Sequence, residues 1–363
     1  MSIIEYLKKE CVLVIAVSLA IITSFLYTPK MEYIDFKTLI LLFNLMIVVS
    51  AFKKLKVLDY IAVEVAKKCS TYRHLSMALV FITFFASMIV TNDVALLTFV
   101  PITIIIGDKL NIDILKIVVF QTLAANLGSS LTPMGNPQNL FLYTYYNISP
   151  ITFFVITGPI AIMAVIFLYG LILKSRNNII KINLDRVNIV NRKQLLFYSI
   201  LLIVILLSVF HLIDYRISFV ITLLIVAIMD RKLFFEVDYS LLITFIGFFI
   251  FIGNISNSSM VQGFMEQILS SESSTYYTGI LASQFISNVP ATMLLSGFTD
   301  HFKELLVGVN VGGMGTLIAS LASVISYKLY CNYHNQNSGK YLRIFTLYNI
   351  FGLVLFTIIL KFI

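Results

Sequence analysis

A single stretch of the sequence, residues 117–173, carries no acidic, basic or histidine side chain. A core helix of a water-soluble domain needs far fewer consecutive uncharged residues than this. The whole chain is 59% hydrophobic and only 12% charged, so in water it would expose large apolar areas. We therefore expect the lipid bilayer to be its solvent, with one membrane domain filling the chain.

The same composition disfavours several classes of function. The sequence has no long polar segment for a catalytic, nucleotide-binding or sensory module, and no phosphate-binding loop that ends in Lys-Ser or Lys-Thr, so an ATP-driven pump is disfavoured. The net charge of +8 comes from basic residues in short loops beside apolar segments, which indicates membrane topology rather than nucleic-acid binding. The three cysteines form no CxxC pair and the four histidines are scattered. We therefore expect no metal centre, no disulfide framework and no organic cofactor.

Seven apolar segments are predicted to cross the membrane as straight helices, because a helix needs about 20 residues to cross about 30 Å of hydrocarbon. They are residues 11–27, 38–52, 151–173, 195–211, 217–229, 239–253 and 341–360. Residues 75–106 have a different length, too long for one span and too short for two. They are predicted to form a re-entrant hairpin with its tip at Thr91, Asn92 and Asp93.

Residues 114–146 show the same excess of length, but they are interrupted by two glycines and two prolines within residues 126–139. This segment is predicted to be one span that is unwound in its middle. The second half of the chain repeats the pattern, with a hairpin over residues 276–298 and a broken span over residues 305–327. The breaks are expected at residues 287–290 and 310–316.

Each half therefore contains a span, an amphipathic stretch, a hairpin, a glycine-broken span and a closing span. The amphipathic stretches are residues 55–68 and 259–269. We expect an N-terminal repeat over residues 1–173, a basic loop and linking span over residues 174–216, and a C-terminal repeat over residues 217–363.

The distribution of Lys and Arg supports this topology with the N-terminus in the cytoplasm. With this orientation 21 of the 26 Lys and Arg residues lie on the cytoplasmic side. Five lie outside, namely Lys30, Lys37, Arg216, Lys303 and Lys361. The first hairpin enters from the cytoplasm and the second from outside, as in the inverted repeats of secondary transporters. The predicted fold class is an all-α polytopic membrane protein of the plasma (cytoplasmic) membrane, an inverted-topology repeat with two re-entrant hairpins and two broken transmembrane helices.

Four helix breaks at membrane depth imply a polar cavity, because an unpaired backbone group in hydrocarbon costs several kcal/mol. The hairpin tips and unwound segments are expected to meet near the midplane and to bind substrate and cation there. The alternative is that their polar residues only join helices and that their glycines only allow close packing. The predicted substrate-binding residues are Thr91, Asn92, Ser129, Thr132, Asn136, Ser287, Asn288, Gly313 and Thr316. The predicted cation-coupling residues are Asp93, Asn92, Asn288, Gly128 and Gly312.

Asp93 is the only ionisable residue within the four discontinuous segments, away from their ends. A carboxylate at that depth is unfavourable unless it pairs with a cation or takes up a proton. We predict that Asp93 couples transport to a cation, either by binding sodium with Asn92 and Asn288 or by alternating between protonated and charged forms. The alternative role is a structural N-cap of the following helix. With no basic residue expected at this depth, substrate charge would be met by amides, hydroxyls, helix ends and bound cations.

The residues at the four breaks resemble those of a known family. They are Thr-Asn-Asp-Val-Ala at residues 91–95, Gly-Asn-Pro-Gln-Asn at 135–139, Ser-Asn-Val-Pro-Ala at 287–291 and Gly-Gly-Met-Gly-Thr at 312–316. Over nearly its whole length the chain is similar to the ion transporter superfamily, specifically the citrate-transporter-like permeases. These include arsenite permeases, sodium/proton antiporters of the same fold and divalent anion/sodium symporters. The resemblance implies a homodimer in which hairpins and broken spans move, elevator-like, against a scaffold of straight spans.

The hairpin tips differ in detail from those of the symporters, in which Ser-Asn-Thr helps to bind sodium and substrate carboxylates. Here the equivalent residues are Thr-Asn-Asp at 91–93 and Ser-Asn-Val at 287–289. Asp93 thus replaces a threonine, and Val289 lacks the hydroxyl. The Asn-Asp pair is closer to the arsenite-permease pattern, which implies proton-driven extrusion with Asp93 as the coupling site.

Two function hypotheses follow. The first is secondary active transport of a small anion, a di- or tricarboxylate or an inorganic oxyanion such as arsenite, coupled to a proton or sodium gradient. The second is sodium/proton antiport with Asp93 as the exchanging carboxylate. A membrane-embedded enzyme would need a nucleophile/base pair or metal ligands inside the membrane, and every histidine is at or near a predicted span end. The expected partners are the anion, the coupling cation, the bilayer and a second copy of the chain, without nucleic acid.

Overall fold

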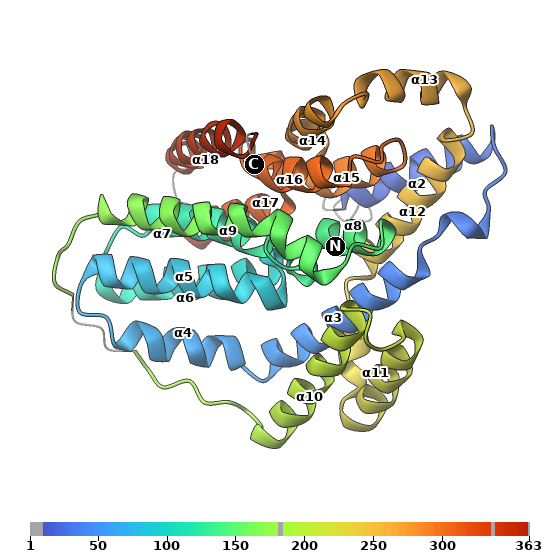
Figure 1. The fold of residues 1–363 in the computed structure, drawn as a ribbon. Helices are drawn as coiled ribbons and strands as arrows, with labels where there is room; N and C mark the ends of the chain where they lie inside the picture. Colours follow the sequence, from blue (N-terminus) through green and yellow to red (C-terminus); the bar gives the residue numbers. More distant parts are fainter. Residues whose placement is uncertain (1–9, 181–183, 335–337, 362–363) are drawn as a thin grey trace.

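The computed structural model describes residues 10–180, 184–334 and 338–361, and this part of the chain folds almost entirely into helices (Figure 1). The first half contains α2 (Cys11–Ser24), α3 (Phe36–Lys54), α4 (Val57–Lys67), α5 (Tyr72–Val90), α6 (Asn92–Leu110), α7 (Leu115–Ser129), α8 (Pro137–Tyr145) and α9 (Pro150–Leu173). Helix α10 (Arg192–Val209) links it to the second half. There follow α11 (Tyr215–Met229), α12 (Tyr239–Ile255), α13 (Ser259–Ile268), α14 (Glu272–Ile286), α15 (Asn288–Ser296), α16 (Phe302–Gly312), α17 (Leu321–His334) and α18 (Ser338–Leu360).

Several of these helices have the length and composition of membrane spans. Among the described residues, α3, α5, α9, α10 and α18 are each long and apolar enough to cross a bilayer, and α12 with α13 forms a sixth candidate that is bent by 103°. The apolar segments at Val12–Ser24 and Tyr215–Met229 are shorter. Every segment predicted as a straight span is a helix here. The fold class is therefore confirmed as an all-α polytopic membrane protein.

The two halves are built from the same series of elements. Helices α3 to α9 correspond in order to α12 to α18, with a helix, a short second helix, a hairpin, a broken span and a closing helix in each. The short amphipathic helices α4 and α13 lie at opposite ends of the molecule in Figure 1. The two halves also contact each other: α2 packs against α12, and α11 packs against α3. The order of elements in the two halves agrees with the predicted repeat, whose boundaries stay a prediction.

Both hairpins break where the sequence indicated, although their arms have different limits. The first arms, α5 and α6, have 19 residues each, so the hairpin extends beyond residues 75–106 at both ends. Polar residues such as Arg73 and Asp108 continue the helices past the apolar stretch, and apolar composition alone does not mark those ends. The second hairpin runs from Glu272 to Ser296, and its returning arm, α15, has only nine residues.

The broken spans differ more from the expectation. In the first span the helical chain continues through Ser129 and the break covers residues 130–136, whereas it was predicted to begin at residue 126. In the second span the break covers residues 313–320 and not 310–316. Asn126 and Asn310 are therefore helical, because each lies in a turn before the glycines rather than within the unwound segment. Short 3₁₀ turns, η2 (Pro133–Gly135) and η4 (Leu317–Ala319), occupy the two breaks.

The helices pack as two groups that meet along α8 and α15. Helices α2, α3, α10, α11 and α12 contact one another, and the hairpins and broken spans contact one another. Between the groups, α3 packs on α8 and α12 packs on α15. At this junction the hydroxyl groups of Thr38 and Thr144 are hydrogen-bonded, and the ring centroids of Phe141 and Phe249 are 5.7 Å apart.

Candidate functional site

The two hairpin tips have the same backbone conformation. Thr91 has φ 73° and ψ 153°, and Ser287 has φ 72° and ψ 152°. Positive φ is unfavourable for a residue with a side chain, and such strain persists where the surrounding structure enforces it, often at functional sites. Each tip residue is followed directly by an asparagine, Asn92 or Asn288, that starts the returning helix and is only 4% exposed. The two tips are thus two copies of one local structure.

Asn126 connects the first hairpin tip to the second half of the chain. Its side-chain oxygen accepts hydrogen bonds from the Asn92 amide at 3.2 Å and from the Ser320 hydroxyl at 2.9 Å. Its side-chain amide lies 3.2 Å from the Ser323 hydroxyl and 3.4 Å from the carbonyl oxygen of Gly313. All four side chains are buried. This first cluster therefore joins the first tip to the break of the second span.

Asn310 occupies the matching position in the second half and reaches into the break of the first span. Its side-chain amide donates to Asn139 at 2.7 Å, and its oxygen accepts from Asn136 at 3.3 Å. Asn136 also donates to the Ser129 hydroxyl at 3.1 Å. Asn136 caps α8 by accepting a hydrogen bond from the backbone amide of Asn139 at 2.8 Å. In each half, one asparagine before the break thus contacts the break of the other half and the start of the helix that follows it.

The breaks leave one buried polar atom without a partner. Among the described residues, the Ser287 hydroxyl at the second tip makes no hydrogen bond. A buried unpaired hydroxyl is unfavourable by about 1–3 kcal/mol. The nitrogen of the Asn288 side chain lies close by the first residue of the second break, since a Cβ atom built on Gly313 would be 3.0 Å from it. The second tip therefore presents an unsatisfied hydroxyl and an amide beside the second break.

The first tip opens into a cavity of about 600 Å³. Thr91 and Asp93 line it together with Asn136 of the broken span. It is also lined by the end of α3 and the turn after it, including three lysines, and by Glu236 and Asp238 ahead of α12. The lysines are Lys53, Lys54 and Lys56, of which Lys54 is paired with Asp230. Basic residues therefore line this cavity, and the expectation that none lies at the depth of Asp93 stays a prediction.

Asp93 is partly buried, and within the described part of the chain its carboxylate makes no hydrogen bond or ion pair. Only its backbone amide is bonded, to the side-chain oxygen of Asn92 at 2.9 Å. The N-cap of α6 is Thr91, and no side chain caps that helix. The alternative role of Asp93 as a structural cap is thus wrong. Its carboxylate faces the cavity without a protein partner, as a group that takes up a proton or a cation would.

Thr132 and Thr316 were both predicted to bind substrate. In the structure their hydroxyl groups form hydrogen bonds that join the broken spans to the hairpins. The Thr132 hydroxyl donates to the carbonyl oxygen of Met88 at 2.5 Å, and the Thr316 hydroxyl donates to that of Gln284 at 3.0 Å. Met88 and Gln284 occupy the same place in their hairpins, three residues before the tip residue. These hydroxyl groups are therefore used in packing the two repeats.

Gly128 and Gly312, predicted as cation-coupling residues, lie where the broken spans touch the outgoing arms of the hairpins. A Cβ atom on Gly128 would lie 2.3 Å from the carbonyl oxygen of Phe84, and one on Gly312 would lie 2.8 Å from Ser283. The carbonyl oxygen of Gly312 also accepts a hydrogen bond from Gln284 at 2.7 Å. Both glycines thus allow close packing of the helices, and their cation-coupling role stays a prediction.

The sequence singled out the right segments but missed several members of the two clusters. Asn126, Asn139 and Asn310 lie inside or beside the motifs at the breaks, and only their pairing across the repeat makes them prominent. Ser320 and Ser323 were missed, and their spacing at the start of α17, three residues apart as for Asn136 and Asn139, was the available signal. In the described part of the chain no group of three or more His, Cys, Asp or Glu side chains is placed to hold a metal ion.

Substitution of Asn126 tests the importance of the first cluster. We expect Asn126→Leu to lower the free energy of unfolding by about 1–3 kcal/mol, because it removes a partner from the side-chain amide of Asn92 and from the buried hydroxyl groups of Ser320 and Ser323. Thermal unfolding of the purified protein in detergent measures this. The control is Asn257→Ala at an exposed residue, which removes side-chain hydrogen bonds to Tyr33, Gly253 and Asn254 and should lower the unfolding temperature less, because water can replace these partners. Equal unfolding temperatures for the two variants would contradict this role of Asn126.

Comparison with known proteins agrees with this architecture. The family model described as "Citrate transporter" matches residues 2–323. The chain is 35% identical over 314 residues to "Uncharacterized transporter MJ0456" of Methanocaldococcus jannaschii, which covers 86% of this chain and 85% of that protein. It is 30% identical over 298 residues to "Inner membrane protein YbiR" of Escherichia coli, covering 82% and 80% of the two chains. The human "P protein" is 33% identical over 117 residues, which is 32% of this chain and 14% of that protein.

The family match covers both hairpins and both helix breaks, so it includes every residue of the two asparagine clusters. The relatives that match most of their own length are named as a transporter and a membrane protein, which agrees with a transport role and not with an enzyme. With its paired hairpins and broken spans, this chain is a membrane transporter that belongs to the citrate transporter family.

Proposed function

We propose that the protein is a secondary active transporter that carries a small anion across the plasma membrane, driven by a proton or sodium gradient. The observation that carries the proposal is the unpaired carboxylate of Asp93 in the same cavity as the first hairpin tip and Asn136. A coupling ion and a substrate that bind in one cavity can influence each other's affinity directly. Candidate substrates are di- and tricarboxylates and inorganic oxyanions such as arsenite.

The substrate would bind where the tips and the breaks meet. Thr91 and Asn136 line the cavity side of this region, and the N-terminal end of α6 lies there at Asp93 and Val94. Ser287 supplies a hydroxyl that no described residue uses. Helix N-termini and backbone amides favour an anion. Asn92, Asp93 and Asn288 would hold a sodium ion, or Asp93 would exchange a proton.

We further propose that the cavity opens to the cytoplasm, with the N-terminus on the same side. The distribution of basic residues supports this orientation, because Lys53, Lys54 and Lys56 line the cavity and belong to the side that is rich in Lys and Arg. An elevator-like motion would then carry the hairpins and broken spans past α3 and α12. The sparse junction along α8 and α15 supports that motion. A homodimer is the expected assembly, and the mass of the protein in detergent tests it.

Sodium/proton antiport is a second candidate, favoured by two further carboxylates in the same cavity. Glu236 and Asp238 are both exposed there and would attract a cation toward Asp93. This mechanism would need no organic substrate.

Reconstituted proteoliposomes distinguish the two candidates. Anion transport predicts uptake of citrate, succinate, sulfate or arsenite that depends on an imposed proton or sodium gradient. Antiport predicts sodium-dependent proton movement with no added anion. Thermal unfolding with each anion and with sodium identifies the ligand beforehand, because a ligand that binds only the folded state raises the unfolding temperature. If none of these fluxes exceeds that of empty liposomes, the proposed function is wrong.

A further inference from the structure

A second cavity, of about 560 Å³, lies apart from the transport site. It is formed where α5, α7 and α18 begin and where α9 ends, with the loop between α6 and α7 on one side. Its charged lining residues are Lys116, Lys174, Arg176, Lys340 and Asp113. None of them belongs to a hairpin tip or a helix break. Four cations against one carboxylate make this a basic cavity.

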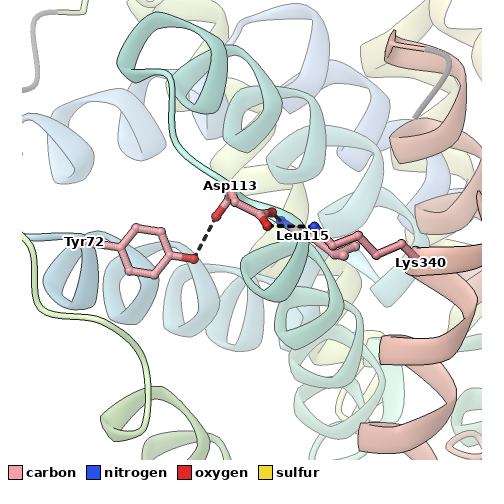
Figure 2. A network of polar contacts seen from close by, with 4 residues as sticks. All are labelled: Tyr72, Asp113, Leu115 and Lys340. Carbon is pink, nitrogen blue, oxygen red and sulfur yellow. Dashed lines mark hydrogen bonds and ion pairs between the residues drawn. The ribbon is translucent and has the colours of Figure 1, made fainter. Parts of the chain in front are cut away.

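The single carboxylate is already engaged (Figure 2). Asp113 accepts hydrogen bonds from the backbone amide of Leu115 at 3.0 Å and from the ammonium group of Lys340 at 3.0 Å, and its carbonyl oxygen accepts one from the Tyr72 hydroxyl at 3.0 Å. Burial by itself raises the pKa of Asp113, but the Leu115 amide and Lys340 outweigh it and hold the pKa below its ordinary value. Asp113 is therefore charged at neutral pH and is matched by Lys340.

Within the described chain the other three cations are not in direct ion pairs, although Lys116 also interacts electrostatically with Asp113. Lys116, Lys174 and Arg176 form no salt bridge with any described residue. Three helices also direct their N-terminal ends toward the cavity, since Tyr72 and Leu115 are the first residues of α5 and α7 and Lys340 lies in the first turn of α18. Helix N-termini carry partial positive charge. The cavity thus combines unmatched side-chain cations with backbone dipoles of the same sign, which suits an anion.

The surroundings of the cavity distinguish a lipid from a soluble anion. Helices α9 and α18 pack against each other, and both expose apolar side chains beyond the cavity. Ile166 on α9 is 66% exposed and Leu347 on α18 is 64% exposed, as expected for surfaces that contact acyl chains. Ile344 continues the apolar surface of α18 into the cavity itself. A ligand with a negative headgroup in the cavity could therefore place long apolar tails on the exposed surfaces of α9 and α18.

We propose that this cavity binds the phosphate of an anionic phospholipid, held by Lys116, Lys174 and Arg176, with the acyl chains along the exposed faces of α9 and α18. Basic cavities between the ends of membrane helices are suited to such headgroups. The headgroup would tie the end of α9 to the starts of α7 and α18, which join the two repeats. The proposal depends on the membrane fold alone, and neither on the transported substrate nor on the coupling ion.

Native mass spectrometry tests the proposal with the full chain in detergent and added dioleoyl-phosphatidylglycerol or dioleoyl-phosphatidylcholine. We expect the wild type to retain phosphatidylglycerol in preference to phosphatidylcholine. Each of Lys116→Gln, Lys174→Gln and Arg176→Gln should weaken this retention about fivefold, as expected for the loss of one cation near a lipid surface. Asp113→Asn should strengthen it, because it removes the one negative charge of the cavity.

The matched control is Lys328→Gln, which removes one charge from an exposed residue of α17 outside the cavity and should leave retention unchanged. Thermal unfolding in phosphatidylcholine establishes that each variant is folded. If a triple variant does not fold, the three single variants still test the proposal. Unchanged retention in all three variants, or an equal loss in Lys328→Gln, would overturn the proposal. Stabilisation by glycerol 1-phosphate or inorganic phosphate without retained phosphatidylglycerol would also overturn it, in favour of a soluble phosphate.

Discussion

Asp93→Asn is expected to abolish cation-coupled accumulation while the protein remains folded. Asparagine has nearly the same size as aspartate, but it neither takes up a proton nor offers a negative charge to a cation. A membrane potential of 100 mV is worth about 2.3 kcal/mol per charge, so a cycle that moves one net charge supports about fiftyfold accumulation. Proteoliposomes with an imposed gradient measure this. The wild type should accumulate its anion, and the variant should only equilibrate it.

The control for Asp93 is another carboxylate of the same cavity. Glu236 lies on η3 (Arg231–Glu236), and it is exposed. Glu236→Gln makes the same change of charge and should keep gradient-driven accumulation. Thermal unfolding of both variants separates loss of coupling from loss of folding. If Asp93→Asn accumulates substrate as well as the wild type does, Asp93 has no part in the coupling.

Gly128→Ala is expected to have the second large effect, by forcing the first hairpin away from its broken span. The added Cβ would lie 2.3 Å from the carbonyl oxygen of Phe84 and 2.6 Å from the Ser87 hydroxyl, both far inside van der Waals contact. A backbone carbonyl cannot turn aside as a side chain can, so α5 and α7 must separate. Overpacking of this kind destabilises by about 1–3 kcal/mol. We expect a lower unfolding temperature and near-complete loss of transport, since the tip moves with α5.

Two further glycines provide matched comparisons for Gly128. Gly170 on α9 has no atom within 4 Å of its added Cβ, so Gly170→Ala should leave transport unchanged and should not reduce stability. Gly312 is the counterpart of Gly128 in the second half, with Ser283 at 2.8 Å and the Cα atom of Ile280 at 3.0 Å. Gly312→Ala should therefore have an intermediate effect. Equal unfolding temperatures for Gly128→Ala and Gly170→Ala would contradict the close packing of α5 and α7.

Local chemistry explains why the hairpins and breaks could be located from the sequence. Glycine and proline interrupt helices, and residues 126–139 contain both within an apolar stretch. Excess apolar length around Thr91 indicated the first tip, and Pro290 with the repeated order of segments indicated the second at Ser287. The limits of the breaks were less accurate. Asn126 and Asn310 remain helical, and each makes hydrogen bonds to the other half from the last turn of its helix, near the glycines.

The roles of individual polar residues were harder to predict. Thr132, Thr316 and Asn136 all have small polar side chains beside a break, yet only Asn136 lines the cavity of the first tip. The two threonine hydroxyl groups are bound to hairpin carbonyl oxygens. A hydroxyl group serves equally well as a ligand or as a packing contact, and only the position of its partner decides between them.

The sequence by itself determined that the chain is a polytopic helical membrane protein with two related halves, because apolar length, glycine, proline and charge act locally along the chain. The tertiary structure alone decided which asparagine pairs across the repeat, which helices form the junction along α8 and α15, and which carboxylates share a cavity with Asp93. The physical reason is that an apolar side chain is about equally stable against lipid and in the protein interior. The same kinds of residue therefore cover the buried and the exposed faces of α9, and hydrophobicity does not specify its neighbours.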